Sequence, residues 1–154
     1  MSEPKFVPKP GQVDYTNIRY APVMNIVVVK GNKVLLVQRS ANMRLYPNFW
    51  NGISGFLDDQ QSIEEKVYEE LREELSLSPT DIKNITRGQM IFQEAPEYHK
   101  TWLVVPVRVE VATDKFTLDW EAQHAKWFTP AEAAKLDSLP GFISVLAQFF
   151  PEVV

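Results

Sequence analysis

The sequence predicts a strand-rich α/β fold, in which a mixed β-sheet is covered by α-helices on both faces. One observation is a series of β-branched runs separated by turn residues, which is typical of strands. Another is that three segments carry apolar residues at helical spacing. The strands are apolar enough for both faces of the sheet to be buried. With 154 residues and 45% hydrophobic content, the chain is large enough for one domain with one sizeable core.

The N-terminal segment is predicted to be an extended arm rather than a packed element. Residues 1–14 hold three prolines and a glycine, which favour irregular backbone. The folded domain is therefore expected at residues 15–154. Such an arm could exchange between two copies of the chain, which would give a homodimer.

A β-hairpin is predicted early in the domain. Residues 24–29 and 33–38 are rich in branched apolar side chains, and the pair Gly31-Asn32 between them is suited to a two-residue turn. A further strand is expected before the hairpin, at residues 14–20.

The segment at residues 39–56 is too long for a simple connection, and it is therefore a candidate functional loop. It contains Arg39 and Arg44, and the arginine side chain is suited to bidentate recognition of phosphate. It also contains aromatic side chains that suit the stacking of a base, those of Tyr46, Phe49 and Trp50. The alternatives are that Arg39 is a solvated strand end and that Trp50 belongs to the core.

An acid-rich helix is predicted at residues 62–76. Ser62 is a good N-cap, and Glu65 three residues later completes a capping box. At 100° per residue, one face carries an apolar stripe made by Ile63, Val67, Leu71 and Leu75. A neighbouring face carries three carboxylates, those of Glu70, Glu73 and Glu74.

These three carboxylates favour a site for a divalent cation. Glu74 is expected to project between Ile63 and Val67 rather than toward water. Carboxylates one turn apart on a partly buried face repel each other, and each loses hydration. A hard cation with oxygen ligands is the usual remedy, and Mg²⁺ is the common one. The alternative is a solvated surface helix, which can be equally rich in acids.

The second half of the chain is predicted to complete the sheet and its helical cover. Two long strands are expected at 82–94 and 98–112, and Pro106 within the second predicts an edge position or a bulge. Helices are expected at 130–136 and 140–150, the latter with an apolar stripe that suits packing on the sheet.

Composition argues against several classes of protein. A net charge of −4 and a pI near 5.2 argue against nonspecific binding to a nucleic-acid duplex or a membrane. The absence of cysteine removes disulfides, thiolate metal sites and a cysteine nucleophile. The N-terminal residues show neither a signal peptide nor a lipidation motif, and no apolar run has the length of a transmembrane helix. A cytoplasmic location is therefore expected.

Residues 55–77, GFLDDQQSIEEKVYEELREELSL, resemble the motif of the Nudix hydrolase family. That family carries the pattern G-x5-E-x7-R-E-U-x-E-E-x-G-U, where U is an aliphatic residue. The matching positions are Gly55, Glu70, Leu71, Glu73, Glu74 and Leu77. Three positions depart from the pattern: Gln61 stands for the first glutamate, Glu69 for the arginine and Ser76 for the last glycine.

The resemblance implies the Nudix fold and an Mg²⁺-dependent pyrophosphohydrolase, which cleaves the diphosphate bond of a nucleoside diphosphate linked to another group. Mn²⁺ could replace Mg²⁺. Glu121, which stands where many members carry an acid in a later loop, is the candidate general base. Glu73 is a second catalytic candidate, as a group that positions water. The implied metal ligands are Glu70, Glu73 and Glu74, and the candidate substrate-binding residues are Arg39, Arg44 and Gly55.

The departures from the pattern keep other functions open. In the family the arginine holds the following glutamate by an ion pair, whereas Glu69 adds a like charge that Arg72 could offset as an i, i+3 partner. Gln61 brings no charge to a metal. A Nudix-like nucleotide-binding or regulatory domain with little hydrolysis is therefore the alternative function. The run RLYPNFWNGISG also resembles isopentenyl diphosphate isomerase, but that enzyme works with a cysteine, which this chain lacks.

Overall fold

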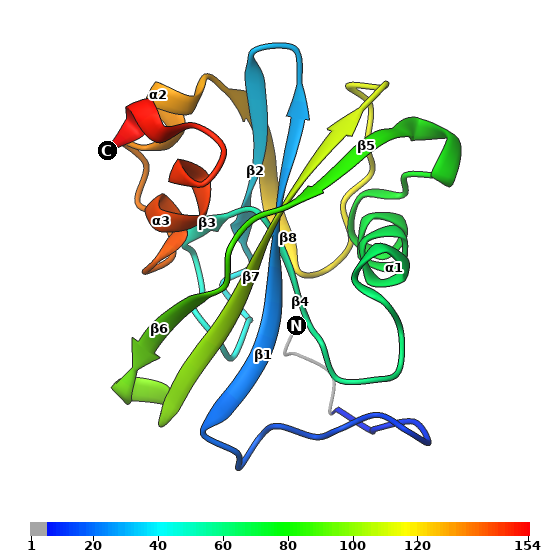
Figure 1. Cartoon of the computed structure of the whole chain (residues 1–154), viewed down its shortest axis with the longest axis vertical. Coiled ribbons are helices and arrows are strands. Elements are labelled where there is room, and N and C mark those ends of the chain that lie inside the picture. Colours follow the sequence, from blue (N-terminus) through cyan, green and yellow to red (C-terminus); the bar gives the residue numbers. More distant parts are fainter. Residues whose placement is uncertain (1–5) are drawn as a thin grey trace.

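Two long parallel strands form the centre of the molecule (Figure 1). In the computed structural model, which describes residues 6–154, strand β1 (Tyr20–Lys30) pairs with β7 (Lys100–Val111) along nearly its whole length. Both strands are rich in β-branched residues, which suit a pleated and buried surface. The six residues 24–29 of β1 are all buried, so this strand is covered on both faces.

Each central strand changes its partner halfway along its outer edge. On the side of β1 the antiparallel partners are β4 (Ile53–Phe56) and then β2 (Lys33–Arg39). On the side of β7 they are β6 (Ile91–Ala95) and then β5 (Ile82–Arg87), also antiparallel.

Strand β2 carries the remaining two strands. The short strand β3 (Trp50–Asn51) and the longer β8 (Ala122–Phe128) both pair with β2 in antiparallel register. The described residues thus form an eight-stranded mixed sheet.

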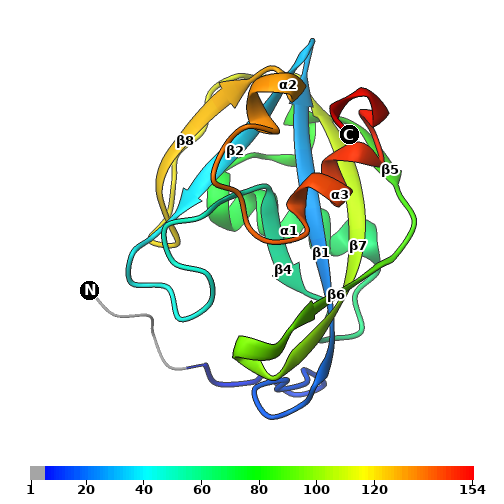
Figure 2. The same ribbon diagram turned by 90° about the vertical axis from the view of Figure 1, so that its left-hand side faces the viewer.

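Helices cover both faces of this sheet, which confirms the predicted fold class (Figures 1 and 2). Helix α1 (Ile63–Leu75) lies on one face, and α2 (Pro130–Ala133) with α3 (Phe142–Ala147) lies on the other. Each side has its own apolar cluster. The cluster under α1 contains Val67, Leu71, Leu75, Val107 and Val109, and the cluster under α2 and α3 contains Val27, Val29, Ala133, Phe142 and Leu146.

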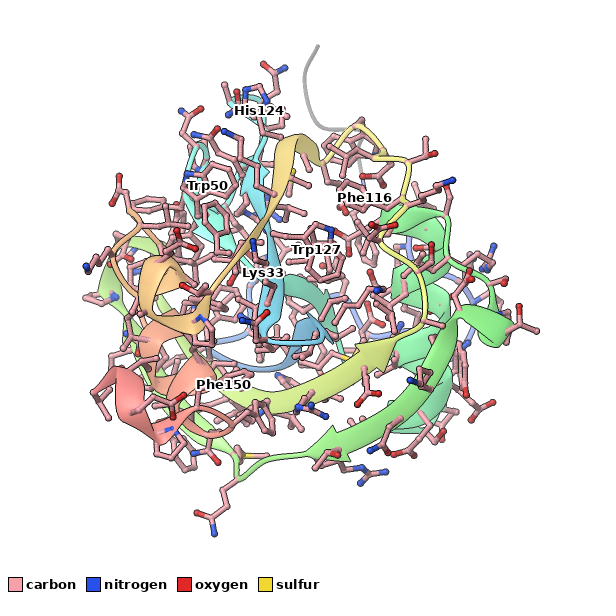
Figure 3. All side chains as sticks on the ribbon, turned by 90° about the horizontal axis from the view of Figure 1, so that it is seen from above. Lys33, Trp50, Phe116, His124, Trp127 and Phe150 are labelled. Carbon is pink, nitrogen blue, oxygen red and sulfur yellow. The ribbon has the colours of Figure 1, made fainter. Side chains whose placement is uncertain are left out.

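Tryptophan side chains mark the two faces of the β2–β8 pair. Trp127 and Phe116 both pack against the cluster under α1, whereas Trp50 packs edge-on against Phe128, with ring centroids 5.5 Å apart, on the opposite face (Figure 3). Phe49 also packs against the α2–α3 cluster. Phe49 and Trp50, which were considered for base stacking, therefore belong to the core.

Several predicted elements are confirmed. The hairpin is present, with Val28 opposite Leu35 and Lys30 opposite Lys33. The acid-rich helix begins after Ser62, whose hydroxyl accepts a hydrogen bond from the Glu65 amide while the Glu65 carboxylate accepts one from the Ser62 amide. Two short 3-10 helices also occur, Pro79–Asp81 and Pro96–Tyr98, and a third, Pro151–Val153, follows α3. No helix among residues 6–154 is both long and apolar enough to cross a membrane.

The two C-terminal helices are shorter than predicted. Helix α2 ends at Ala133 and α3 at Ala147, although the expected ranges were 130–136 and 140–150. The apolar stripe of the last segment still packs as expected, because Phe142, Val145 and Leu146 are buried against the sheet.

The expected strand at 82–94 is wrong in one respect, because it is two strands that break at residues 88–90. Pro106 explains the break. It lies in β7, a central strand rather than an edge, and it has no N–H to donate. At this position the Gly88 amide donates to the Pro106 carbonyl at 2.8 Å and the partner strand is interrupted.

The expected strand at 14–20 is also wrong, because the first strand begins at Tyr20. The ammonium group of Lys100 donates to the backbone carbonyls of Tyr15, Thr16 and Ile18, which bends the chain around it. Residues 12–18 thus pack on their own chain, which gives no support to an exchange between two subunits. Residues 1–5 of the expected arm lie outside the described residues, and the division of the chain at residue 14 stays a prediction.

Helix α1 ends at a strained residue, which generates a stability prediction. Ser76 has the left-handed conformation, with φ 59° and ψ 33°, and its amide donates to the Arg72 carbonyl. Glycine adopts this conformation without a Cβ penalty. We expect Ser76→Gly to raise the free energy of unfolding by about 0.5–1 kcal/mol, measured by urea denaturation. Ser76→Ala, which keeps the Cβ, serves as the control, and an equal gain from both variants would contradict this explanation.

Candidate functional site

Three carboxyl groups from two distant segments meet at the sheet-facing side of α1. Glu70 and Glu74 lie one turn apart on the helix, and Glu121 precedes strand β8. Glu74 is 8% exposed and shares hydrogen bonds with both Glu70 and Glu121. Its Oε2 atom is buried and has no hydrogen-bond partner within residues 6–154. The sequence thus places one carboxylate of the acid-rich helix inside the molecule.

The electrostatic consequence is a strong preference for the protonated acids. The pKa of Glu70 is raised to about 7: burial is the main cause, the hydrogen bond from Glu74 opposes it, and the nearby charges of Glu121 and Glu73 add to the rise. Burial also raises the pKa of Glu74 well above its usual range, and both Glu121 and Glu70 add to that effect. Burial and the neighbouring acids therefore outweigh the charges that would stabilise the ionised forms of Glu70 and Glu74.

Gly55 in strand β4 allows this close packing. A Cβ atom at this position would lie 2.6 Å from both the Cδ and the Oε1 atom of Glu70, which is too close for any real contact. The candidate substrate-binding glycine therefore provides room for the carboxyl group of Glu70 against the sheet. This approach explains in physical terms why a glycine suits the first position of the motif.

The backbone of the sheet edge holds Glu121 in place. The Ser40 amide, just after β2, donates to the Glu121 carbonyl at 2.8 Å. The Glu121 amide donates to the Oδ1 atom of Asp119 at 3.0 Å. Burial raises the pKa of Asp119. The candidate general base thus reaches the helix carboxylates from a loop that is fixed at both the β2 and β8 strands.

The expected effect of Glu69 is corrected by the structure. The carboxylate of Glu69 lies 3.1 Å from the ammonium nitrogen of Lys66, one turn earlier, so the like charge is already compensated. Lys66 also lies 3.4 Å from Asp58 and 3.2 Å from Asp59, and its side chain is only 5% exposed. Arg72, the partner considered from the sequence, instead lies 3.9 Å from Glu73.

The Lys66 cluster is strongly held together by charge. Burial alone would lower the pKa of the Lys66 ammonium group, but hydrogen bonds to Glu69 and Asp59 and the charge of Asp58 raise it above its usual value. Lys66 therefore remains charged, and its charge also favours the ionised form of Glu70. Lys66 is therefore the partner of Glu69, a role that the sequence analysis considered only for Arg72.

Glu73 lies at the rim of the site. Its side chain is 51% exposed, and it lines the same cavity as Glu70. A half-exposed carboxylate keeps its hydration and can reach a bound ligand through water. The structure therefore brings Glu70, Glu74 and Glu121 together and leaves Glu73 beside them.

The two candidate phosphate-binding arginines also line this cavity, but they differ in their surroundings. The Nε atom of Arg39 donates to the Leu45 carbonyl at 3.0 Å, so this side chain braces the loop that follows β2. Arg44 lies near Asp14 and Lys100: hydrogen bonds with Thr16 are the main cause that lowers the pKa of Asp14, burial is the main cause that lowers the pKa of Lys100, and the charge of Arg44 adds to both effects. Arg44 is thus the arginine closer to the N-terminal arm.

A cavity of about 850 Å³ opens beside the acid cluster. That volume lies within the range of small-molecule sites, which is roughly 300–1,000 Å³. Its lining combines acidic, basic and aromatic groups. The aromatic residues that line it are Phe6, Tyr15, Tyr46, Phe56, Tyr98, Trp102 and Trp120. Tyr46 is therefore the residue of the expected base-stacking set that faces the cavity.

The chemistry of the acid cluster fits a divalent cation. The donors are carboxylate oxygens, which suit Mg²⁺ and Mn²⁺, and the unpartnered Oε2 atom of Glu74 is a buried acceptor without a donor. Within residues 6–154, no three acidic, histidine or cysteine side chains are already grouped as a metal-binding set. To bind a cation, these carboxyl groups would therefore have to lose the protons that they share and reorient their oxygens toward the ion.

Sequence reasoning missed Lys66 and Lys100. The signal for Lys66 was present, because it stands three residues before Glu69 on one helix. No comparable signal marks Lys100, whose partners lie more than 80 residues away in the chain. Asn25 and Asn51 were also missed. These buried amides hydrogen-bond to each other at 2.9 Å and line the cavity.

Comparison with known proteins gives one family. The family model described as the NUDIX domain matches residues 19–149. The NAD-capped RNA hydrolase NudC of Pseudomonas aeruginosa is 27% identical over 123 residues, which are 79% of this chain. The chain spans only 38% of the length of that relative.

Solved structures show the same fold. An Ap4A hydrolase of C. elegans superposes with a TM-score of 0.70 at 20% identity, covering 86% of this chain and 97% of its own. The NUDIX domain of Shewanella oneidensis NrtR, solved with ADP ribose, gives 0.70 at 18% identity, covering 88% and 89%.

The raised pKa values generate a prediction for the metal-free protein. In the unfolded chain these glutamates ionise near their usual pKa, whereas in the folded chain the pKa of Glu70 is about 7 and that of Glu74 is raised well above its usual range. Between these values the folded state binds more protons than the unfolded state, so its stability falls as the pH rises. We expect Glu74→Gln to reduce that fall between pH 5 and pH 8, measured by urea unfolding in EDTA.

The control is Glu152→Gln, which removes the charge of an exposed carboxylate outside the acid cluster. This variant should keep the pH dependence of the wild-type protein. Parallel stability curves for wild type and Glu74→Gln would contradict the burial of an ionisable group at residue 74.

Proposed function

Because the chain belongs to the NUDIX family, we propose that it is a Nudix-type pyrophosphohydrolase that hydrolyses the diphosphate bond of a nucleoside diphosphate linked to a second group, with Mg²⁺ or Mn²⁺ as cofactor. The observation that carries this proposal is the buried acid cluster at the side of a ligand-sized cavity. Carboxylates that are buried next to one another are unfavourable unless a cation or protons balance their charge.

The proposed ligands of the cation are Glu70 and Glu74, with Glu73 as a further ligand or a water-positioning group. When bound, the cation would neutralise phosphate oxygens and lower the pKa of a coordinated water. The unpartnered Oε2 atom of Glu74 supports this assignment, because it is an oxygen donor without a competing hydrogen bond among the described residues. Gly55 supports it as well, since it lets Glu70 lie against the sheet.

Glu121 is the proposed general base. Its carboxylate lies beside both helix acids, and its backbone is held by Ser40 and Asp119. In hydrolysis, water attacks phosphorus, the bridging P–O bond breaks, and a base must accept the proton of the attacking water. The Glu121 carboxylate can accept that proton while its backbone stays hydrogen-bonded to Ser40 and Asp119.

The substrate proposal rests on the cavity. Arg39 and Arg44 supply positive charge for phosphate oxygens, and the aromatic side chains supply apolar surface for a planar group. The relatives act on or bind NAD-capped RNA, Ap4A and ADP ribose according to their names. These three compounds, together with nucleoside triphosphates, therefore form the panel to be tested.

The first prediction concerns the cation. A ligand that binds only the native state raises its stability by about 2.7 kcal/mol at one hundred times its dissociation constant. We expect added Mn²⁺ to raise the Tm of the wild-type protein, and the double variant Glu70→Gln/Glu74→Gln to lose that rise. Glu152→Gln, an exposed acid near the C-terminus, is the control. An unchanged rise in the double variant would place the cation elsewhere.

The second prediction concerns turnover. With Mg²⁺ present, at least one compound of the panel should be hydrolysed, with product release measured by phosphate detection after phosphatase treatment or by chromatography. Glu121→Gln should lower kcat by about 10²–10⁴-fold, the usual contribution of a general base. Arg44→Ala should raise KM by about tenfold, which corresponds to roughly 1.4 kcal/mol.

Arg108→Ala is the matched control, because Arg108 lies on β7 and does not line the cavity. Its kinetic constants should equal those of the wild type. Binding of a panel compound without any turnover would replace the hydrolase by the alternative, a nucleotide-binding regulatory domain.

A further inference from the structure

Residues 6–19, which continue the predicted N-terminal arm up to β1 and are called the arm below, form part of the wall of the cavity. Residues 9–16 line it together with Glu70 and Glu121, although residues 6–19 form neither a helix nor a strand. An irregular segment holds such a position only where specific contacts fix its backbone. The buried side chain of Lys100 makes such contacts directly, and the buried side chain of Lys66 holds Asp58, which makes others.

The first anchor is Lys100 at the start of β7. Its ammonium group donates to the backbone carbonyls of Tyr15, Thr16 and Ile18, with 3.2 Å to the Thr16 oxygen. Among residues 6–154, no carboxylate lies within ion-pair distance of this ammonium group. The three carbonyl oxygens therefore take the place of water around the buried ammonium group of Lys100. Within residues 6–154, all the hydrogen-bond acceptors of this group belong to the arm.

The second anchor is Asp58, in the loop before α1. Its carbonyl accepts a hydrogen bond from the Val13 amide at 2.6 Å, and its Oδ2 atom accepts one from the Gln12 side chain at 2.9 Å. Its Oδ1 atom lies 3.4 Å from the buried ammonium group of Lys66. This chain of contacts connects the arm to the helix that carries the acid cluster.

Between the two anchors the arm presents Tyr15 to the domain. The Tyr15 ring is stacked on Phe56, with centroids 6.1 Å apart and planes inclined by 6°. Phe56 in turn meets Trp102 edge-on at 5.9 Å. All three side chains line the cavity, and Tyr15 is only partly buried. The arm thus extends an aromatic face that begins inside the domain.

We propose that Tyr15 is a specificity-determining residue, which contacts a planar aromatic group of the substrate, and that Lys100 is the positioning residue that holds Tyr15 there. The inference rests on the proposed function, because it assigns a role in substrate selection at the same cavity. The position of Phe56 supports it. Phe56 follows Gly55 in strand β4 and so faces the other side of that strand, but both residues line the cavity, which therefore reaches from the acid cluster to the aromatic face.

The first test is kinetic and uses the panel compound that is hydrolysed fastest. Tyr15→Ala should raise KM by about tenfold and leave kcat within about twofold, because the chemistry lies at the acid cluster. Tyr15→Phe should restore the wild-type KM, since it keeps the ring. Tyr20→Ala is the control: Tyr20 is an exposed tyrosine of β1 outside the cavity. A wild-type KM for Tyr15→Ala would overturn the proposal.

The second test concerns Lys100 and needs no catalysis. Lys100→Met keeps the aliphatic chain and removes the ammonium group, so amide hydrogen exchange of residues 12–18 should become at least tenfold faster. Lys30→Met, at the exposed hairpin end, should leave that exchange unchanged. Exchange within the central strand β1 reports whether the variant remains folded. Unchanged protection of residues 12–18 in a folded Lys100→Met protein would overturn the role of Lys100.

The two tests separate this inference from the proposed function. If turnover occurs and the Tyr15 variants are normal, the inference fails and the hydrolase stands. If no compound is hydrolysed, the dissociation constant of ADP ribose is compared for wild type, Tyr15→Ala and Tyr15→Phe by calorimetric titration. Weaker binding in Tyr15→Ala alone supports the inference without the hydrolase, and equal or absent binding overturns it.

Discussion

A carboxyl group inside the molecule is the constraint on which the site depends. Helix α1 must turn its apolar stripe toward the sheet, and Glu74 lies beside Leu71 and Leu75 on the turn that is buried with it. Burial of a carboxylate is unfavourable, so the surrounding structure has to balance its charge or keep it protonated. Glu70 and Glu121 add acids rather than cations to this environment. The proposed cation would relieve the same electrostatic cost that weakens the metal-free fold.

The sheet brings the parts of the site together through backbone pairing. Strand β4 supplies Gly55, and β2 ends just before Ser40, whose amide fixes Glu121 at the start of β8. These segments come from different parts of the chain, yet each is set by register with a neighbouring strand. Because strands position side chains more rigidly than free loops do, the cluster can hold acids at close range.

The sequence predicted what depends on neighbours in the chain. The capping box at Ser62, the stripe of α1 and the hairpin are local patterns, and the structure contains all three. The acids of the motif were found for the same reason. Contacts between distant segments were not predictable in this way: Lys100 with the arm depends on tertiary packing, and the place of Pro106 in a central strand depends on which strands become neighbours. The ion pair of Lys66 with Glu69 is a local contact at i, i+3 spacing, so the sequence contained a signal for it. It was missed because the family pattern has an arginine at the position of Glu69.

The parallel pairing of β1 with β7 also limits how early the protein can fold during its synthesis. Strands β2 to β6 and helix α1 all separate these two strands in the chain, so the centre of the sheet consists of nonlocal contacts. Contacts of this kind form slowly, because a long loop must close before they stabilise anything. During synthesis, the apolar faces of β1 and α1 therefore emerge well before their main partner exists. Until β7 leaves the ribosome, this nascent chain carries unpaired strand edges, which makes it a natural client for chaperones.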